Sequence, residues 1–174
     1  VVNNDGLIEG GDLGILIQAY TEQQSYFTAE INNNADGVIR SFSSEFDGAG
    51  ISLGGFLASS TVNNAGLIDA ANQGIKIESD NATVTNDGDI LGGGAGLWAG
   101  DESNGVYVTN NAGASIIGAD NDGIILFEGG DVINAGHIEG QQRFNADGVS
   151  GWTEDVNNVD ENGASFRLDN ALSG

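Results

Sequence analysis

A short segment that joins asparagine, glycine and isoleucine recurs along this chain, and its spacing restricts the possible folds more than any other feature. Four copies have the same length, and two carry one extra residue. The four equal copies span residues 4–8, 64–68, 86–90 and 134–138, and the longer ones span 34–39 and 111–116. Successive copies begin 22 to 31 residues apart by their glycines, and repeats of about 20–50 residues are typical of solenoids and other repeat architectures.

Isoleucine closes every copy, whereas the residue immediately before it is apolar, polar or charged. A period of two residues is that of a β-strand with one buried face. Helical repeats are excluded, because glycine, asparagine and aspartate are poor in helix interiors. The isoleucine column predicted to point inward is Ile8, Ile39, Ile68, Ile90, Ile116 and Ile138. A second inward column precedes each glycine: Val2, Ile31, Val62, Val84, Val108 and Val132.

A second glycine follows the first after 8 to 13 residues and opens a further short strand. Its predicted inward residues include Ile15, Ile17, Ile51, Leu53, Ile75, Ile77, Leu97, Ala99, Ile124 and Leu126. Its predicted outward residues are Leu16, Ser52, Lys76, Trp98, Ile125 and Ser150. Three short strands per repeat, separated by corners, make one coil of a solenoid in which each coil contacts only its neighbours.

The predicted fold is therefore all-β, a right-handed parallel β-helix of about six coils that occupies residues 1–151. Loop excursions are expected in the first two coils, at residues 18–30 and 40–49. Residues 152–174 are expected to form a degenerate final coil or a C-terminal cap and contact segment.

The corners are rich in glycine, asparagine and aspartate, the residues that tolerate positive φ best, so we expect positive φ at the sharp turns. Asparagines at one position of successive coils can form a ladder of amide hydrogen bonds, as in other stacked β-structures. Asn34 lies one residue early, which predicts a local bulge. The predicted structural ladder is Asn4, Asn64, Asn86, Asn111 and Asn134.

The formal charge of −22, with only four lysines and arginines, argues against several partners. Nucleic acids and anionic membrane surfaces attract basic proteins. No apolar run approaches the roughly 18 residues of a membrane-spanning helix, so we expect no membrane insertion. There is no cysteine, which excludes disulfides and thiolate metal sites and suits a chain that stays unfolded during export.

Acidic residues gather near the predicted corners, where stacked carboxylates would repel one another. A Ca²⁺ ion with oxygen ligands would relieve that repulsion, and a simple solvated acidic surface is the other interpretation. Calcium is the one cofactor considered. Its candidate ligands are Asp36, Asp47, Asp122 and Asp147.

No catalytic or cofactor-binding residue can be assigned from the sequence. A polysaccharide lyase needs a basic residue beside an acid cluster, and a glycoside hydrolase needs two carboxylates at a fixed separation. Lys76 has no carboxylate set at a fixed offset, and the acids are too scattered to define a pair. His137, the only histidine, lies in an outward column. We therefore predict that the chain is not an enzyme.

Apolar and aromatic residues in the outward column, the excursions and the tail form the predicted contact surface. Lys76 and Trp98 lie in adjacent coils and are expected to make a cation–π contact. The interface candidates are Leu16, Tyr20, Tyr26, Phe27, Trp98, Ile125, Trp152 and Phe166. The repeat begins at residue 2 without a recognisable cap, and open strand edges invite pairing. The solenoid is thus expected either to continue in a longer parent or to stack end to end with another copy.

The Asn-Ala-Gly-x-Ile segment, followed by Gly-Ile and then Val-x-Asn, resembles the β-helical passenger repeats of bacterial autotransporters and related large secreted adhesins. Residues 64–68 with Gly74-Ile75, and residues 134–138, carry this resemblance most fully. It implies a secreted or cell-surface bacterial protein used in adhesion or as a scaffold. It brings no shared catalytic residues to this chain.

From these features we predict an extracellular structural β-solenoid. It would be a self-assembling filament subunit or an adhesin stalk segment, joined head to tail into a homo-oligomer or polymer, with a carbohydrate or a host-surface ligand as a further partner. The other hypothesis is a carbohydrate-binding or polysaccharide-cleaving β-helix. Paired acids and a basic residue in a groove would favour an enzyme, whereas matching unpaired coil ends would favour a filament.

Overall fold

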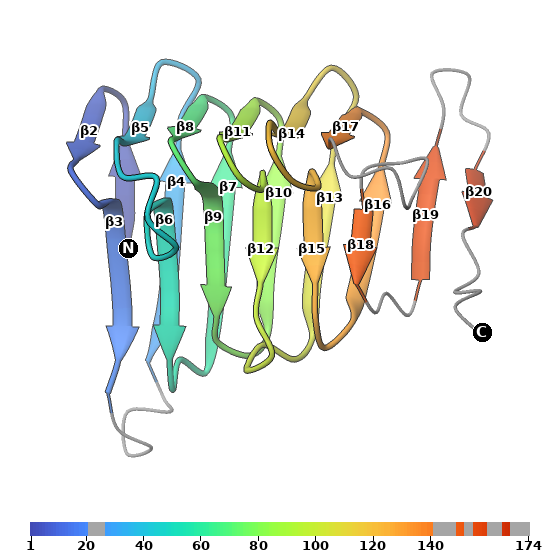
Figure 1. Ribbon diagram of the computed structural model, residues 1–174, viewed down its shortest axis with the longest axis horizontal. Helices are drawn as coiled ribbons and strands as arrows, with labels where there is room; N and C mark the ends of the chain where they lie inside the picture. The colour runs from blue at the N-terminus through green and yellow to red at the C-terminus, as the bar shows by residue number, and fades with distance from the viewer. Residues whose placement is uncertain (21–26, 141–148, 152–154, 160–164, 168–174) are drawn as a thin grey trace.

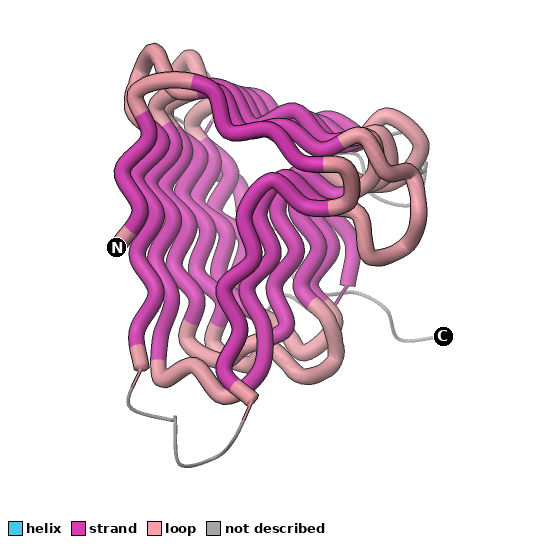
Figure 2. The backbone as a smooth tube through the Cα atoms, turned by 90° about the vertical axis from the view of Figure 1, so that its left-hand side faces the viewer, coloured by secondary structure: helices cyan, strands magenta, loops and turns pink. Residues whose placement is uncertain are grey.

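The computed structural model describes residues 1–20, 27–140, 149–151, 155–159 and 165–167, and in them the chain winds into three stacked β-sheets (Figure 1). Each sheet takes one strand from each coil, and successive coils pair in parallel. Figure 2 views this stack from the N-terminal end, with the strands of each sheet lying one behind another. The prediction of an all-β parallel β-helix is confirmed.

The sheet that we call A has the strand order β1-β4-β7-β10-β13-β16-β19-β20. All its pairings are parallel except the last, since β20 runs antiparallel to β19. Its strands are β1 (Val2–Asn4), β4 (Thr28–Asn33), β7 (Ser59–Asn64), β10 (Ala82–Asn86), β13 (Val106–Asn110), β16 (Gly130–Asn134), β19 (Asp155–Val159) and β20 (Ser165–Arg167).

The other two sheets each contain six described strands, one from each coil. Sheet B consists of β2 (Leu7–Gly10), β5 (Val38–Ser41), β8 (Leu67–Ala70), β11 (Asp89–Gly92), β14 (Ser115–Gly118) and β17 (His137–Gly140). Sheet C consists of β3 (Leu13–Ala19), β6 (Ala49–Gly55), β9 (Gln73–Glu78), β12 (Leu97–Ala99), β15 (Ile124–Leu126) and β18 (Val149–Gly151).

The core lies between the three sheets and consists of the predicted aliphatic columns in continuous register. In sheet B, for example, Ile39 pairs with Ile68, which in turn pairs with Ile90, and all three are fully buried. Burying one such side chain stabilises the fold by about 1.5–3 kcal/mol. In the first coil the equivalent residues are only partly buried: Val2, Ile8, Ile15 and Ile17.

Two features interrupt the regular stack. Residues 42–48, between β5 and β6, leave the coil and lie across sheet C (Figure 1). At the other end sheet A continues past residue 151, because β19 pairs in parallel with β16 before β20 closes that edge. Of the excursion predicted at residues 18–30, residues 21–26 lie outside the described part of the chain.

The repeated glycines are required chiefly because neighbouring coils approach closely, and not for the positive φ that we predicted. Of the first glycines of the six repeats, only Gly113 has a positive φ, of 88°. A Cβ on Gly50 would lie 2.8 Å from the carbonyl oxygen of Gly74, and one on Gly96 would lie 2.7 Å from that of Gly123. The next coil's backbone fills the space that a side chain would need, so the prediction of positive φ was wrong at most of these corners.

Replacing Gly96 by alanine is expected to lower the free energy of unfolding by about 1–3 kcal/mol, the usual cost of overpacking. The added methyl group would meet both the carbonyl oxygen of Gly123 and the side chain of Ile116. Gly11→Ala is the matched control, because no atom lies within 4 Å of its added Cβ. Urea unfolding followed by circular dichroism would measure both. Equal losses in the two variants would contradict this explanation.

Candidate functional site

Three strands of the first coil pair on one side only in the described part of the chain, and we call them the N-terminal edge: β1, β2 and β3. Edge strands present free backbone N–H and C=O groups that can pair with another chain. The core residues of this edge are also partly open, whereas Ile31, Ile39 and Ile51 in the next coil are fully buried. The N-terminal edge therefore combines unsatisfied hydrogen-bonding groups with accessible apolar surface.

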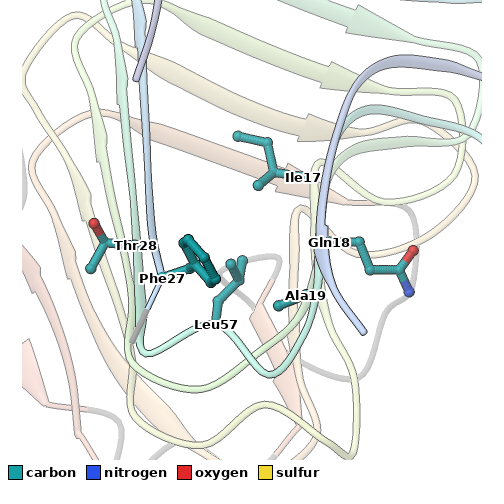
Figure 3. Close-up of a pocket in the computed structure, with 6 residues that line it drawn as sticks. All are labelled: Ile17, Gln18, Ala19, Phe27, Thr28 and Leu57. Atoms are coloured by element: carbon teal, nitrogen blue, oxygen red, sulfur yellow. The ribbon is translucent and has the colours of Figure 1, made fainter. Parts of the chain in front are cut away.

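A hollow of about 280 Å³ opens at this edge, where β3 ends and β4 begins. Figure 3 shows Ile17, Ala19, Phe27 and Leu57 around its interior, whereas Gln18 points away from it. Phe27 remains 59% exposed, because in the described part of the chain no further coil covers it. Within the described residues the hollow thus lies at a partly exposed end of the core.

Buried asparagines form a hydrogen-bond ladder along the junction of sheets A and B, which we call the inner ladder. Each side-chain amide donates to the side-chain oxygen of the next coil at 2.7–2.8 Å. The same nitrogen also reaches backbone carbonyls, as Asn86 Nδ2 does at Gly88 (3.0 Å) and Ser115 (2.9 Å). Its described members are Asn4, Asn33, Asn64, Asn86, Asn110 and Asn134.

The prediction that Asn111 belongs to the ladder was wrong, since Asn110 occupies that position. In the two longer copies the extra residue enlarges the corner and leaves the strand register intact. Asn33 consequently pairs with both Asn4 and Asn64, and the bulge predicted at Asn34 is not found in β4. Asn34 and Asn111 lie just outside and donate to Asp5 and Asp87, each at 2.7 Å.

A second ladder, which we call the outer ladder, runs in the opposite direction on the exposed face of sheet A. Asn63 donates to Asn32 at 2.8 Å, and Asn32 donates to Asn3 at 2.9 Å. Sequence reasoning missed this ladder, although the asparagine pairs 3–4, 32–33 and 63–64 were a usable signal. Adjacent residues of a strand point to opposite faces, so each pair places one amide inside the solenoid and one outside.

The outward column of sheet C is largely covered instead of exposed. Lys76 is only 4% exposed, and its ammonium contacts Asp47 at 2.7 Å and Glu78 at 3.1 Å. Phe46 belongs to the same loop as Asp47, and its ring centroid lies 5.2 Å from the Lys76 nitrogen. The structure contains the predicted contact between Lys76 and Trp98, with 5.6 Å from the nitrogen to the ring centroid.

The predicted contact residues of this column therefore differ in exposure. Leu16 is 50% exposed, Ile125 is buried, and Trp98 is half-buried. The Trp98 ring packs edge-on between Phe46 and Phe127, with centroids 5.6 and 5.8 Å away. Beside it a hollow of about 200 Å³ is lined by Trp98, Phe127 and Asp101.

The remaining interface candidates are separated from this cluster. Tyr20 and Phe27 are exposed near the N-terminal edge. Tyr26 and Trp152 lie outside the described residues, and for Phe166 only the backbone, in β20, is described.

The calcium candidates are not brought together in the described part of the chain. Asp36 is exposed at a corner, Asp47 pairs with Lys76, and Asp122 is buried. Asp147 lies outside the described residues. Within the described ranges no three acidic or histidine side chains are close enough to hold a metal ion.

The other titratable groups considered from sequence have simple surface partners. His137 is exposed and lies 3.0 Å from Glu139, and Arg40 lies 3.4 Å from Asp69. Among the described residues no helix is long and apolar enough to cross a bilayer.

No protein-family model, curated protein or solved structure matches this chain. The resemblance to autotransporter passengers therefore remains a prediction, and the geometry of the chain itself has to carry any functional argument.

Replacing Asn86 by alanine is expected to cost about 1–3 kcal/mol of stability, because it removes the acceptor of the Asn64 amide and the donor to the Asn110 side-chain oxygen within the buried ladder. Asn63→Ala is the matched control, since Asn63 is exposed and donates a single side-chain hydrogen bond, to Asn32. That change should cost less than about 1 kcal/mol. Thermal and urea unfolding would compare them, and a larger loss for Asn63→Ala would rule out the structural role of the inner ladder.

The pKa of Lys76 should be higher than that of an ordinary lysine. Burial alone would lower the pKa of Lys76, but hydrogen bonds to Asp47 and Glu78, and the charge of both carboxylates, outweigh burial and raise the pKa. The stability supplied by the ammonium is therefore complete below the unfolded-state pKa of about 10.4 and is lost as pH rises through the folded-state pKa.

Because Lys76 is the only lysine, NMR can follow its side chain as a single signal. We expect a midpoint above about 10.4, shifted downward by Asp47→Asn. Asp69→Asn, which removes a carboxylate paired with Arg40, should leave the midpoint unchanged. A normal lysine midpoint in the wild-type chain would show that Lys76 is not held as the structure describes.

Proposed function

We propose that this chain is a structural β-solenoid module that is extended end to end through its N-terminal edge, as a filament subunit or a stalk segment of an adhesin. The observation that carries this proposal is the open first coil. In the described part of the chain its three strands pair on one side only, and its core residues are partly exposed, whereas Ile31, Ile39 and Ile51 in the next coil are fully buried.

A further coil placed on this edge would complete both kinds of interaction at once. It would pair the free backbone groups of β1, β2 and β3, and it would cover Val2, Ile8 and Ile15 as the following coils cover their equivalents. Each side chain that becomes fully buried contributes up to about 1.5–3 kcal/mol. Head-to-tail stacking of copies is a heterologous contact, and such contacts produce open filaments when they do not close.

The composition and the repeat pattern support an extracellular place for this module. The cysteine-free, strongly acidic sequence suits export and solubility. The Asn-Ala-Gly-x-Ile repeats resemble those of secreted bacterial adhesins, in which the β-helix is a scaffold. On this proposal the protein is secreted or displayed at the cell surface, and its role is structural and depends on end-to-end assembly.

Assembly should depend strongly on salt. Each copy carries a formal charge of −22, so copies repel one another until salt shortens the range of the repulsion to about 3 Å at 1 M ionic strength. We expect negative-stain microscopy and light scattering to show rods of increasing length between 0.02 and about 1 M NaCl. Compact single particles at every salt and protein concentration would contradict the proposal.

Carbohydrate binding is the second function considered, and the hollow lined by Trp98, Phe127 and Asp101 is the observation that favours it. Binding sites for small molecules commonly combine aromatic walls with a few polar groups that fix orientation. Here the rings would contact the apolar face of a sugar, and the Asp101 carboxylate would accept hydrogen bonds from its hydroxyl groups.

Isothermal titration with neutral and acidic oligosaccharides would test this second function. Binding that is lost in Asp101→Asn and kept in Asp80→Asn, a change at another exposed carboxylate, would support it. Absence of heat with every oligosaccharide would remove the carbohydrate hypothesis and leave the structural one in place.

A further inference from the structure

The surroundings of Lys76 show how this solenoid holds an ammonium group. The Lys76 nitrogen lies 5.2 Å from the ring centroid of Phe46 and 5.6 Å from that of Trp98. Two carboxylates complete the surroundings, Asp47 at 2.7 Å and Glu78 at 3.1 Å. Aromatic faces attract cations within about 6 Å of the ring centroid. Rings and carboxylates therefore act together on a charged group that is almost fully buried.

Trp98 also belongs to a second group of the same composition, which holds no cation among the described residues. Lys76 lies beside Trp98 in the preceding coil, and Phe127, in the following coil, packs its ring 5.8 Å from the Trp98 ring. These two rings and the Asp101 carboxylate line the hollow of about 200 Å³. In the described part of the chain the Asp101 side chain forms no ion pair and no hydrogen bond. The carboxylate is thus available to a ligand.

Local contacts fix the backbone around this hollow. The Trp98 ring lies against Gly100, where an added Cβ would come within 2.5 Å of the ring atom Cη2. The carbonyl oxygen of Gly100 accepts from both the hydroxyl group and the backbone N–H of Ser103, at 2.5 and 3.2 Å. Ser103 is fully buried, so it anchors the turn that carries Asp101. A site whose backbone is fixed in advance binds its ligand with a smaller loss of conformational entropy.

Charge and hydrogen-bonding capacity restrict the ligand. The formal charge of −22 attracts cations and repels anions. A primary ammonium has three N–H donors, and the described lining of the hollow offers it one carboxylate instead of the two that meet Lys76. A quaternary ammonium donates no hydrogen bond, so it needs only the rings and one balancing charge. The hollow is also smaller than the roughly 300–1,000 Å³ of sites for drug-sized ligands, which suits a small head group.

We propose that the hollow lined by Trp98, Phe127 and Asp101 binds a quaternary ammonium group of the trimethylammonium type, such as the head group of choline. The two rings contact the methyl groups, and the Asp101 carboxylate balances the positive charge. The site lies in the fourth and fifth coils, around β12 and β15 of sheet C (Figure 1), and it requires no end-to-end assembly. Its ligand is selected by charge, whereas the carbohydrate hypothesis for the same hollow relies on hydroxyl groups.

NMR titration of the full chain with choline chloride tests this site, because the chain contains only two tryptophans. The Trp152→Phe variant identifies which indole N–H signal belongs to Trp98. We expect this signal to shift and to reach saturation as choline is added, and to remain in place with equal concentrations of sodium chloride. The alcohol 3,3-dimethylbutan-1-ol has the shape of choline without its charge, and it should bind at least about fivefold more weakly.

Substitutions test the rings and the carboxylate separately. Phe127→Leu keeps an apolar side chain without a ring and should weaken choline binding about two- to fivefold, whereas Phe127→Tyr should preserve the affinity. Asp101→Asn should weaken binding by a similar factor. Asp120→Asn is the matched control, because it also removes one exposed carboxylate. Asp120 precedes β15 whereas Asp101 follows β12, so the two lie at opposite ends of the parallel strands of sheet C.

Vesicles distinguish the two sources of the head group. Cosedimentation of the chain with phosphatidylcholine vesicles, but not with phosphatidylglycerol vesicles, would support the proposal and identify a lipid head group as the ligand. Binding of free choline without cosedimentation would support the proposal and identify a soluble ligand.

Three results would overturn the proposal. They are an unchanged Trp98 signal with choline, equal affinity for choline and the neutral alcohol, and equal losses in Asp101→Asn and Asp120→Asn. Saturable binding of an oligosaccharide without binding of choline would assign the hollow to carbohydrate instead. Each of these failures leaves end-to-end assembly standing, since rod formation is measured separately and involves the N-terminal edge.

Discussion

The in-register pairing of each coil with the next is the interaction on which the rest of this structure depends. Parallel strands place identical positions of successive coils beside one another, so every column of the repeat becomes a physical column of atoms. Isoleucines stack on isoleucines in the core, asparagine amides donate to asparagine oxygens, and glycines admit the backbone of the following coil. A residue in this solenoid is therefore constrained mainly by its neighbours one coil away, about 22 to 31 residues along the chain.

The same dependence explains how much of the fold the sequence could predict. The core columns were predicted correctly, because a residue such as Ile68 needs the same apolar neighbours in both adjacent coils. The predicted ladder residue Asn111 was wrong by one position. We had counted back from the glycine and so placed the extra residue of the longer copies in the strand. The hydrogen bonds show that the corner absorbs this residue and that Asn110 carries the ladder.

Contacts made by the excursions could not be predicted in this way. Lys76 was expected to point outward into an exposed column, yet Phe46 and Asp47 from an irregular loop enclose it. Nothing repeats in that loop, so no periodicity indicates which sheet it covers. The hollow beside Trp98 has the same origin, because it arises where side chains of different coils happen to meet. Contacts made by residues outside the repeat therefore could be found only from the structure.

Each coil pairs with the next in the same way, so the pattern of contacts changes only at the two ends of the stack. The two ladders run in opposite directions, so in β1 Asn4 donates to the next coil and Asn3 accepts from it. At the far end β20 interrupts the parallel order of sheet A. Within the described residues the two ends thus differ, since β1 pairs in parallel with β4 whereas β20 runs antiparallel to β19.

Amide hydrogen exchange followed by NMR, in the monomer and in the end-to-end assembly that we propose, would test most directly whether coil-to-coil pairing governs stability and that assembly. The amides of β1, β2 and β3 should exchange much faster than those of β6 to β12 in the monomer, and they should become protected on assembly. Equal protection of the first and central coils in the monomer, or assembly that leaves β1 to β3 unprotected, would contradict the account.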